Sequence, residues 1–123
     1  MTTLSEGPHP GGFLNWEVLR DYTRDTVTLA SGTGKLAPGT VLGRITSGGK
    51  FTVLTPGASN GSQNAAGILW GPADATDSDA PAVVLMRGPA IANRHEIILP
   101  EGITEGQTTT ATAALAALGI LLR

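Results

Sequence analysis

The sequence predicts a small, mainly β domain with one short helix near its C-terminus. Three observations lead to this fold class. The chain of 123 residues contains 17 glycines and 8 prolines, which is typical of many short strands joined by turns. About six short runs are rich in strand-forming residues, and only residues 108–118 combine an alanine-rich composition with the start and stop signals of a helix.

Composition also limits the classes of function. The length suits one domain. Only 15% of the residues are charged and the formal net charge is −2, so we expect no direct nucleic-acid partner. The absence of cysteine excludes a disulfide framework, a thiolate zinc site and a cysteine nucleophile. No apolar run approaches the roughly 20 residues of a membrane helix, and residues 1–12 lack the order of a signal peptide, so we expect a soluble intracellular product with no membrane partner.

The first 25 residues have the character of a flexible arm. Residues 5–12 contain two prolines and three glycines, which argues against packed structure. Residues 13–22 alternate too loosely for a firm assignment, although an extended strand is plausible. Three of the five aromatic residues, Phe13, Trp16 and Tyr22, lie in this part of the chain. We therefore predict a flexible arm over residues 1–25 and a β domain over residues 26–123.

The strands of the domain follow in order. Residues 26–30 alternate apolar and polar side chains, as a half-buried strand does. Two β-rich runs flank the glycine pair of the turn at residues 47–49, which predicts a hairpin. Further strands are predicted from short runs with β character, and the whole set is 26–30, 39–46, 50–55, 65–70, 81–86 and 94–99.

The helix has clear boundaries. Thr104 and Gln107 have the spacing of a capping box, and Gly119 stands where a residue in the left-handed conformation ends a helix. Residues 120–123 then form a possible terminal strand. Because alanine and threonine dominate the helix, it buries a thin apolar face, and this lean core favours oligomerisation.

Two catalytic or nucleotide-binding motifs occur in part. Gly34-Lys35 resembles a phosphate-binding loop, but Leu36 replaces the required hydroxyl and a strand follows instead of a helix. Residues 57–61 match the Gly-x-Ser-x-Gly nucleophile elbow, and Asp74, Asp77 or Asp79 and then His95 follow in hydrolase order. Ser59, Asp77 and His95 are therefore a possible hydrolase triad. Pro56 interrupts the strand that an elbow requires, so a flexible loop is the favoured interpretation.

The sequence evidence for a metal site is equally weak. The acidic turn at residues 74–79 lacks the ligand order of a calcium loop, and His9 and His95 lack the spacing of a zinc helix. We therefore expect no catalytic residues, no metal and no cofactor.

The order of features resembles the head decoration (capsid cement) protein family of tailed phages, the lambda protein D-like family. The resemblance runs from about residue 26 to the C-terminus, and its specificity lies in the order and spacing of the pieces. These are TVTLAS at 26–31, APGTVLG at 37–43, AAGIL at 65–69, ILPE at 98–101 and AALAALGI at 113–120.

The resemblance implies a bent ribbon or incomplete barrel of the β-clip kind, assembled as a homotrimer. It implies binding to the major capsid (coat) protein at local three-fold positions of the expanded head, which stabilises the head against internal DNA pressure. The protein would be made in the host bacterial cytoplasm and lie on the exterior of the virion capsid.

The arm suits binding to a coat protein. An extended segment can add a strand to a sheet edge of its partner, and we predict that six apolar side chains of the arm make the contact: Phe13, Leu14, Trp16, Val18, Leu19 and Tyr22. Three arms on one trimer would bind with high effective concentration. The alternatives are a stand-alone β-clip module that binds a small carbohydrate or peptide, and the serine hydrolase of Ser59, Asp77 and His95.

Overall fold

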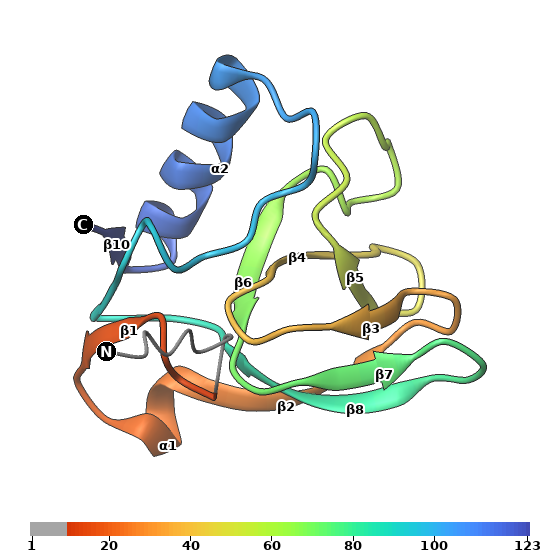
Figure 1. Cartoon of the computed structure of the whole chain (residues 1–123), viewed down its shortest axis with the longest axis horizontal. Helices are drawn as coiled ribbons and strands as arrows, with labels where there is room; N and C mark the ends of the chain where they lie inside the picture. Colours follow the sequence, from red (N-terminus) through yellow and green to blue (C-terminus); the bar gives the residue numbers. More distant parts are fainter. Residues whose placement is uncertain (1–9) are drawn as a thin grey trace, which may run out of the picture.

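The computed structural model describes residues 10–123, which form ten strands and two helices (Figure 1). In chain order the elements are β1 (Leu14–Glu17), α1 (Arg20–Thr23), β2 (Arg24–Leu29), β3 (Gly34–Leu36), β4 (Val41–Arg44), β5 (Phe51–Val53), β6 (Ala65–Leu69), β7 (Ala73–Ala75), β8 (Ala80–Leu85), β9 (Ala90–Ala92), α2 (Glu105–Ala117) and β10 (Ile120–Leu122). The predicted fold class, mainly β with one short C-terminal helix, is confirmed.

Five strands close a small barrel in the order β2-β5-β4-β6-β8. The predicted hairpin is present as β4 and β5, whose register pairs Leu42 with Val53 and Arg44 with Phe51. Its turn needs glycine, because Gly48 and Gly49 have φ values of 89° and 73°. The longest pairing joins β2 to β8, whereas β2 and β5 share a single register pair. The barrel is therefore firmly joined on one side of β2 and barely closed on the other.

A second sheet, in the order β1-β9-β10, brings together segments far apart in the sequence. β1 is antiparallel to β9, and β10 is parallel to it. α2 packs against β6 and β10, which places it beside the barrel in Figure 1. The chain returns from α2 to β10 through Gly119, where φ is 89°. A Cβ on Gly88 would clash with the Gly119 carbonyl, so this return passes directly over the start of β9.

α2 has the predicted boundaries. The Gln107 amide donates to the Thr104 hydroxyl at 3.1 Å, and the Thr104 amide donates to Gln107 Oε1 at 3.0 Å, which completes a capping box. Only Ala111 and Leu115 are buried, so the thin apolar face is also confirmed. Neither helix in the described part of the chain has the length and apolar character needed to cross a membrane.

The cap gives a first testable prediction. Replacing Thr104 with alanine should lower the free energy of unfolding by about 1 kcal/mol, because the helix loses the acceptor for an N-terminal amide. Thr109→Ala is the matched control, since its exposed hydroxyl only bonds back to the Glu105 carbonyl. Urea denaturation measures both variants. An equal loss in the two would contradict a specific role for the cap.

Consecutive residues of the barrel strands pack into two different hydrophobic clusters. Leu42, Leu69 and Val84 face the barrel interior. Their chain neighbours Val41, Ile68 and Leu85 face a second cluster, shared with β9, β10 and α2. Because both faces of the strands are covered at these positions, apolar residues follow one another there and do not alternate with polar ones.

One predicted strand is wrong. Residues 94–99 form a turn followed by an irregular segment, in which Ile98 makes only an isolated bridge to Thr40. The reason is local, because the His95 amide bonds to the Asn93 side chain and the Glu96 amide to the Asn93 carbonyl. The strand in this region is β9, which the sequence analysis did not predict. It also missed β3 and β7, which pair only with each other.

The described part of the expected arm packs against the domain. Phe13 is only 2% exposed and belongs to the cluster next to α2, and β1 is paired along its length with β9. Burial of an aromatic ring together with strand pairing explains why residues 10–25 are held here. Residues 1–9, the rest of the expected arm, lie outside the described residues. The flexibility of the segment and the domain boundary at residue 25 stay predictions.

Candidate partner-binding surface

The six apolar side chains predicted to contact a partner divide into two groups. Phe13 is buried, and Leu14 is partly buried and packs against the same cluster. Trp16, Val18, Leu19 and Tyr22 are between 49% and 58% exposed. Large apolar side chains this exposed are informative when they gather on one segment. Phe13 and Leu14 therefore hold the segment, and the other four side chains are displayed on it.

β1 extends this display across the sheet. In the register of the β1-β9-β10 sheet, Trp16 lies opposite Ile91, and Ile91 lies opposite Leu121. Residues directly opposite on neighbouring strands have side chains on the same face. Leu121 is exposed and Ile91 half-buried. We call these two residues and the four exposed side chains of residues 16–22 the β1–α1 surface.

The four-residue helix α1 is fixed by backbone contacts and one arginine. The amides of Tyr22 and Thr23 both donate to the Leu19 carbonyl, and the Val18 amide donates to the Pro89 carbonyl. Arg87 donates to the Tyr22 carbonyl, pairs with Asp25 at 2.5 Å, and places its guanidinium 5.5 Å from the centre of the Tyr22 ring. These contacts hold Leu19 and Tyr22 outward.

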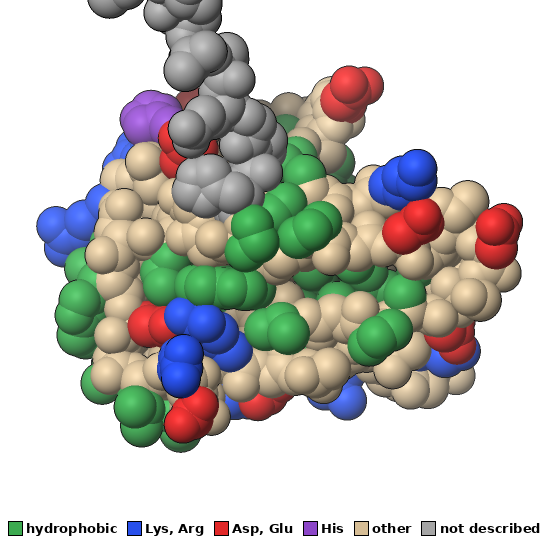
Figure 2. Space-filling view, turned by 60° about the horizontal axis from the view of Figure 1, so that its bottom comes forward, with side chains coloured by type: hydrophobic (Ala, Val, Ile, Leu, Met, Phe, Trp, Pro, Cys, Tyr) green, Lys and Arg blue, Asp and Glu red, His purple; other side chains and the backbone are tan. Residues whose placement is uncertain are grey.

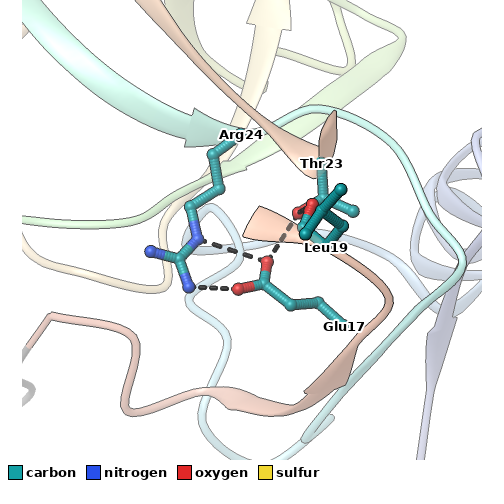
Figure 3. Close-up of polar contacts among 4 residues, drawn as sticks. All are labelled: Glu17, Leu19, Thr23 and Arg24. Atoms are coloured by element: carbon teal, nitrogen blue, oxygen red, sulfur yellow. Dashed lines mark hydrogen bonds and ion pairs between the residues drawn. The ribbon is translucent and has the colours of Figure 1, made fainter. Parts of the chain in front are cut away.

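A polar clasp joins the end of β1 to the start of β2 (Figure 3). The Glu17 carboxylate accepts hydrogen bonds from the Thr23 hydroxyl at 2.6 Å and from Arg24 Nε at 3.2 Å, and it forms an ion pair with the Arg24 guanidinium. The side chains of Glu17 and Arg24 are only 12% and 21% exposed. Water therefore screens this pair less than a surface ion pair.

Trp70, the residue after β6, contacts residues near both ends of the N-terminal segment 10–25. The Arg24 guanidinium lies 3.3 Å from the centre of the Trp70 ring, a cation–π contact. The Phe13 ring meets Trp70 edge to face, with the ring centres 5.9 Å apart. The Gly11 amide donates to the Trp70 carbonyl, and a Cβ at Gly11 would clash with the ring. The segment is thus anchored before and after β1.

The clasp gives a second prediction. Glu17→Gln should lower the free energy of unfolding by about 1–3 kcal/mol, because the partly buried Arg24 loses its counter-charge. Chemical denaturation measures the change, with Glu101→Gln as the control because Glu101 is exposed in a turn. No difference between the two variants would show that the clasp does not hold the segment.

Figure 2 shows the side of the molecule on which α1, β2 and β8 lie. Hydrophobic side chains reach the surface over these elements, next to Lys, Arg, Asp and Glu side chains. The sequence analysis missed Ile91, Leu121 and the clasp. The positions of Ile91 and Leu121 depend on β10 pairing with β9, and their only local signal was the apolar run at residues 120–122. The clasp depends on α1 returning the chain from β1 to β2.

The proposed hydrolase residues lie on three different connections. Ser59 is in the loop between β5 and β6, Asp77 in the turn between β7 and β8, and His95 after β9. All three are exposed, and no hydrogen bond joins any two of them among residues 10–123. No helix follows Ser59 directly, as an elbow would require.

The other motif residues have structural contacts. Lys35 lies in β3 and not before a helix. The Lys50 side chain and the Ser31 amide bond to Asp79 and lower the pKa of its carboxyl group, and the Thr76 hydroxyl and amide do the same for Asp74. No group of three or more metal-ligating side chains occurs in the described ranges. His9 lies outside them.

The comparisons with known proteins agree with this picture. A search of curated proteins finds no match. The family model described as bacteriophage lambda head decoration protein D matches residues 3–120, which is nearly the whole chain. This family consists of structural proteins of the phage capsid and is not a known enzyme family. The chain belongs to the family of bacteriophage lambda head decoration protein D.

Proposed function

We propose that this chain is a decoration subunit that binds the expanded phage head as a homotrimer and stabilises it against internal DNA pressure. The trimers bind the major coat protein at local three-fold positions on the capsid exterior. The family supports the capsid role. The observation that carries the proposal further is the β1–α1 surface, whose four exposed side chains at residues 16–22 stand on a segment anchored in the core.

The anchoring matters for the energetics of binding. Ordering a free arm of about 20 residues costs roughly 20–40 kcal/mol of backbone entropy. Residues 10–25 are already held by Phe13, by the pairing with β9 and by the Glu17 clasp. The entropy of ordering these residues is lost when the domain folds, so it does not reduce the free energy of binding. A pre-ordered surface therefore supports tighter binding than a free arm of the same composition.

The strand β1 offers a second type of contact. It is an edge strand, because the sheet order is β1-β9-β10. A coat-protein strand that adds to this edge would gain main-chain hydrogen bonds, with the exposed apolar side chains supplying selectivity. This is the way in which the N-terminal part of the chain would join a coat-protein sheet.

Trimerisation multiplies these contacts. Burying the exposed halves of Trp16, Val18, Leu19 and Tyr22 is worth roughly 3–6 kcal/mol per copy, which alone gives weak binding. In a trimer, the second and third surfaces bind at high effective concentration once the first is bound. Three weak contacts thereby become a durable attachment.

The test uses shells assembled from the coat protein of the same phage, before and after expansion. Native mass spectrometry of the free chain should show a trimer at micromolar concentration. Co-sedimentation should show binding to expanded shells, which should then unfold at a higher temperature. A chain that stays monomeric and does not sediment with expanded shells would contradict the proposal.

A further inference from the structure

The barrel has an open seam between β2 and β5. Along its other side, β2 pairs with β8 at all six of its residues, from Arg24 to Leu29. Toward β5, the only register pair is Leu29 with Phe51, next to a bond from the Ala30 amide to the Phe51 carbonyl. In Figure 1, β2 runs beside β8 along the bottom of the molecule, away from most of β5. The two strands that close the barrel therefore touch at one end and diverge.

A groove of about 580 Å³ lies between β2 and β5 where the two strands diverge. One wall is formed by residues 25–28 of β2, and the other by residues 48–51 together with Arg44. Met86 and Arg87 complete the lining. Thr26 and Thr28 are exposed in this stretch. The groove thus runs along an edge of β2 that, among the described strands, only β5 reaches, at Leu29.

The backbone of this edge points into the groove. The Val83 carbonyl accepts a bond from the Trp70 amide, so the backbone groups of Val83 point away from β2. Its register partner is Thr26, and opposite residues of an antiparallel pair point either toward each other or apart. Thr26 and, two residues on, Thr28 therefore point their amides away from β8. The bond of the Ala30 amide to Phe51 follows the same alternation.

The size and charge of the groove define what it can receive. The four strand residues that line the groove, 25–28, span about 13 Å, which is enough for a short added strand. Lys50 pairs with Asp79, and Arg87 pairs with Asp25. Arg44, exposed at the rim, has no ion pair among the described residues. Its guanidinium lies over the turn, where a Cβ on Gly49 would come within 3.1 Å of it. Counting only residues 10–123, the rim therefore carries one positive charge without a paired carboxylate.

We propose that this groove receives an extended segment of the coat protein, which pairs with β2 at Thr26 and Thr28 and places a carboxylate opposite Arg44. The inference rests on the proposed function, because it takes the coat protein as the partner. It adds a contact separate from the β1–α1 surface, in which the decoration subunit accepts a strand. Open strand edges are usually blocked or paired in native proteins, and pairing with the partner would satisfy this one.

Hydrogen exchange on expanded coat shells tests the pairing directly. On binding, the amide hydrogens of Thr26 and Thr28 should exchange at least about tenfold more slowly, because each amide gains a hydrogen-bond acceptor. The amides of Asp25 and Val27, which face β8, should change much less. Mass spectrometry with fragmentation to single residues separates these neighbours. Protection at β1 without protection at Thr26 and Thr28 would overturn the inference and leave the proposed function standing.

Two other outcomes are equally decisive. Protection of Thr26 and Thr28 in the free oligomer, before shells are added, would assign the groove to a second copy of this chain. A chain that does not bind the shells at all would overturn the proposed function together with this inference.

Variants at one position separate the backbone amide from the side chain. Thr26→Pro removes the amide that faces the groove, and Thr26→Val keeps it at similar size. We expect the affinity for expanded shells to fall about tenfold for Thr26→Pro and less than about threefold for Thr26→Val. Circular dichroism and thermal unfolding check that both variants fold. Equal affinities of folded proline and valine variants would overturn the inference.

A charge variant keeps the test valid if the proline variant fails to fold. Arg44→Glu should weaken shell binding about tenfold, because it opposes the expected carboxylate. Arg94→Glu makes the same charge change at an exposed arginine outside the groove and should leave binding near the wild-type value. Equal effects of the two substitutions would show a general electrostatic contribution and would overturn the role of Arg44.

Discussion

Replacing Phe13 with alanine is expected to lower the free energy of unfolding by about 3–5 kcal/mol, which is the usual cost of removing a buried aromatic side chain. Phe13 is 2% exposed, belongs to the cluster shared with α2, and meets Trp70 edge to face. A domain of this size has only about 5–15 kcal/mol of stability. Urea denaturation of the variant should therefore show a large shift of the midpoint.

The control for this prediction is Tyr22→Ala. Tyr22 is an aromatic residue of the same segment, but it is 55% exposed, so its removal should change stability by less than about 1 kcal/mol. If Phe13→Ala were equally mild, residues 10–25 would not belong to the cooperative unit of the domain. The segment would then behave as the flexible arm that its composition predicts.

Replacing Trp16 and Leu19 together with alanine is expected to weaken binding to expanded coat shells by at least about 100-fold. Each side chain is half exposed or more, and burying the exposed parts of the two side chains contributes roughly 2–3 kcal/mol to binding per copy. A factor of ten corresponds to about 1.4 kcal/mol, and in a trimer the loss occurs at every contact. Co-sedimentation over a concentration series measures the change.

Ile98→Ala is the matched control for the double variant. Ile98 is also exposed, at 38%, but lies outside the β1–α1 surface. Both proteins should keep a melting temperature close to that of the wild type, because the altered side chains are not in the core. Unchanged binding of a folded Trp16→Ala, Leu19→Ala variant would remove the β1–α1 surface from the proposed function.

Local sequence signals predicted the parts of the fold that local interactions determine. The hairpin of β4 and β5 depends on Gly48 and Gly49, and the start of α2 depends on Thr104 and Gln107. These residues act within a few positions of one another, so their roles can be inferred without knowing the rest of the chain. The strand predicted at residues 65–70 from its local run of apolar residues is observed as β6, Ala65–Leu69.

The contacts that hold the N-terminal segment could not be predicted in this way. Phe13 and Arg24 meet Trp70, which is more than forty positions further along the chain. The prolines and glycines before Phe13 indicated an arm, and nothing local showed that Trp70 would receive it. The strand prediction for residues 94–99 was wrong because of a local interaction. The Asn93 side chain accepts a hydrogen bond from the His95 amide, which favours a turn in a run that otherwise resembles a strand.

The β1-β9-β10 sheet also has a consequence for how the protein matures. Its strands come from residues 14–17, 90–92 and 120–122, so its pairings close very long loops. Such distant contacts form slowly because their loop-closure entropy must be overcome first. The row of Trp16, Ile91 and Leu121 exists only after both ends of the chain have reached β9. Nascent or incompletely folded chains therefore do not present this row, and the proposed attachment through it would select fully folded molecules.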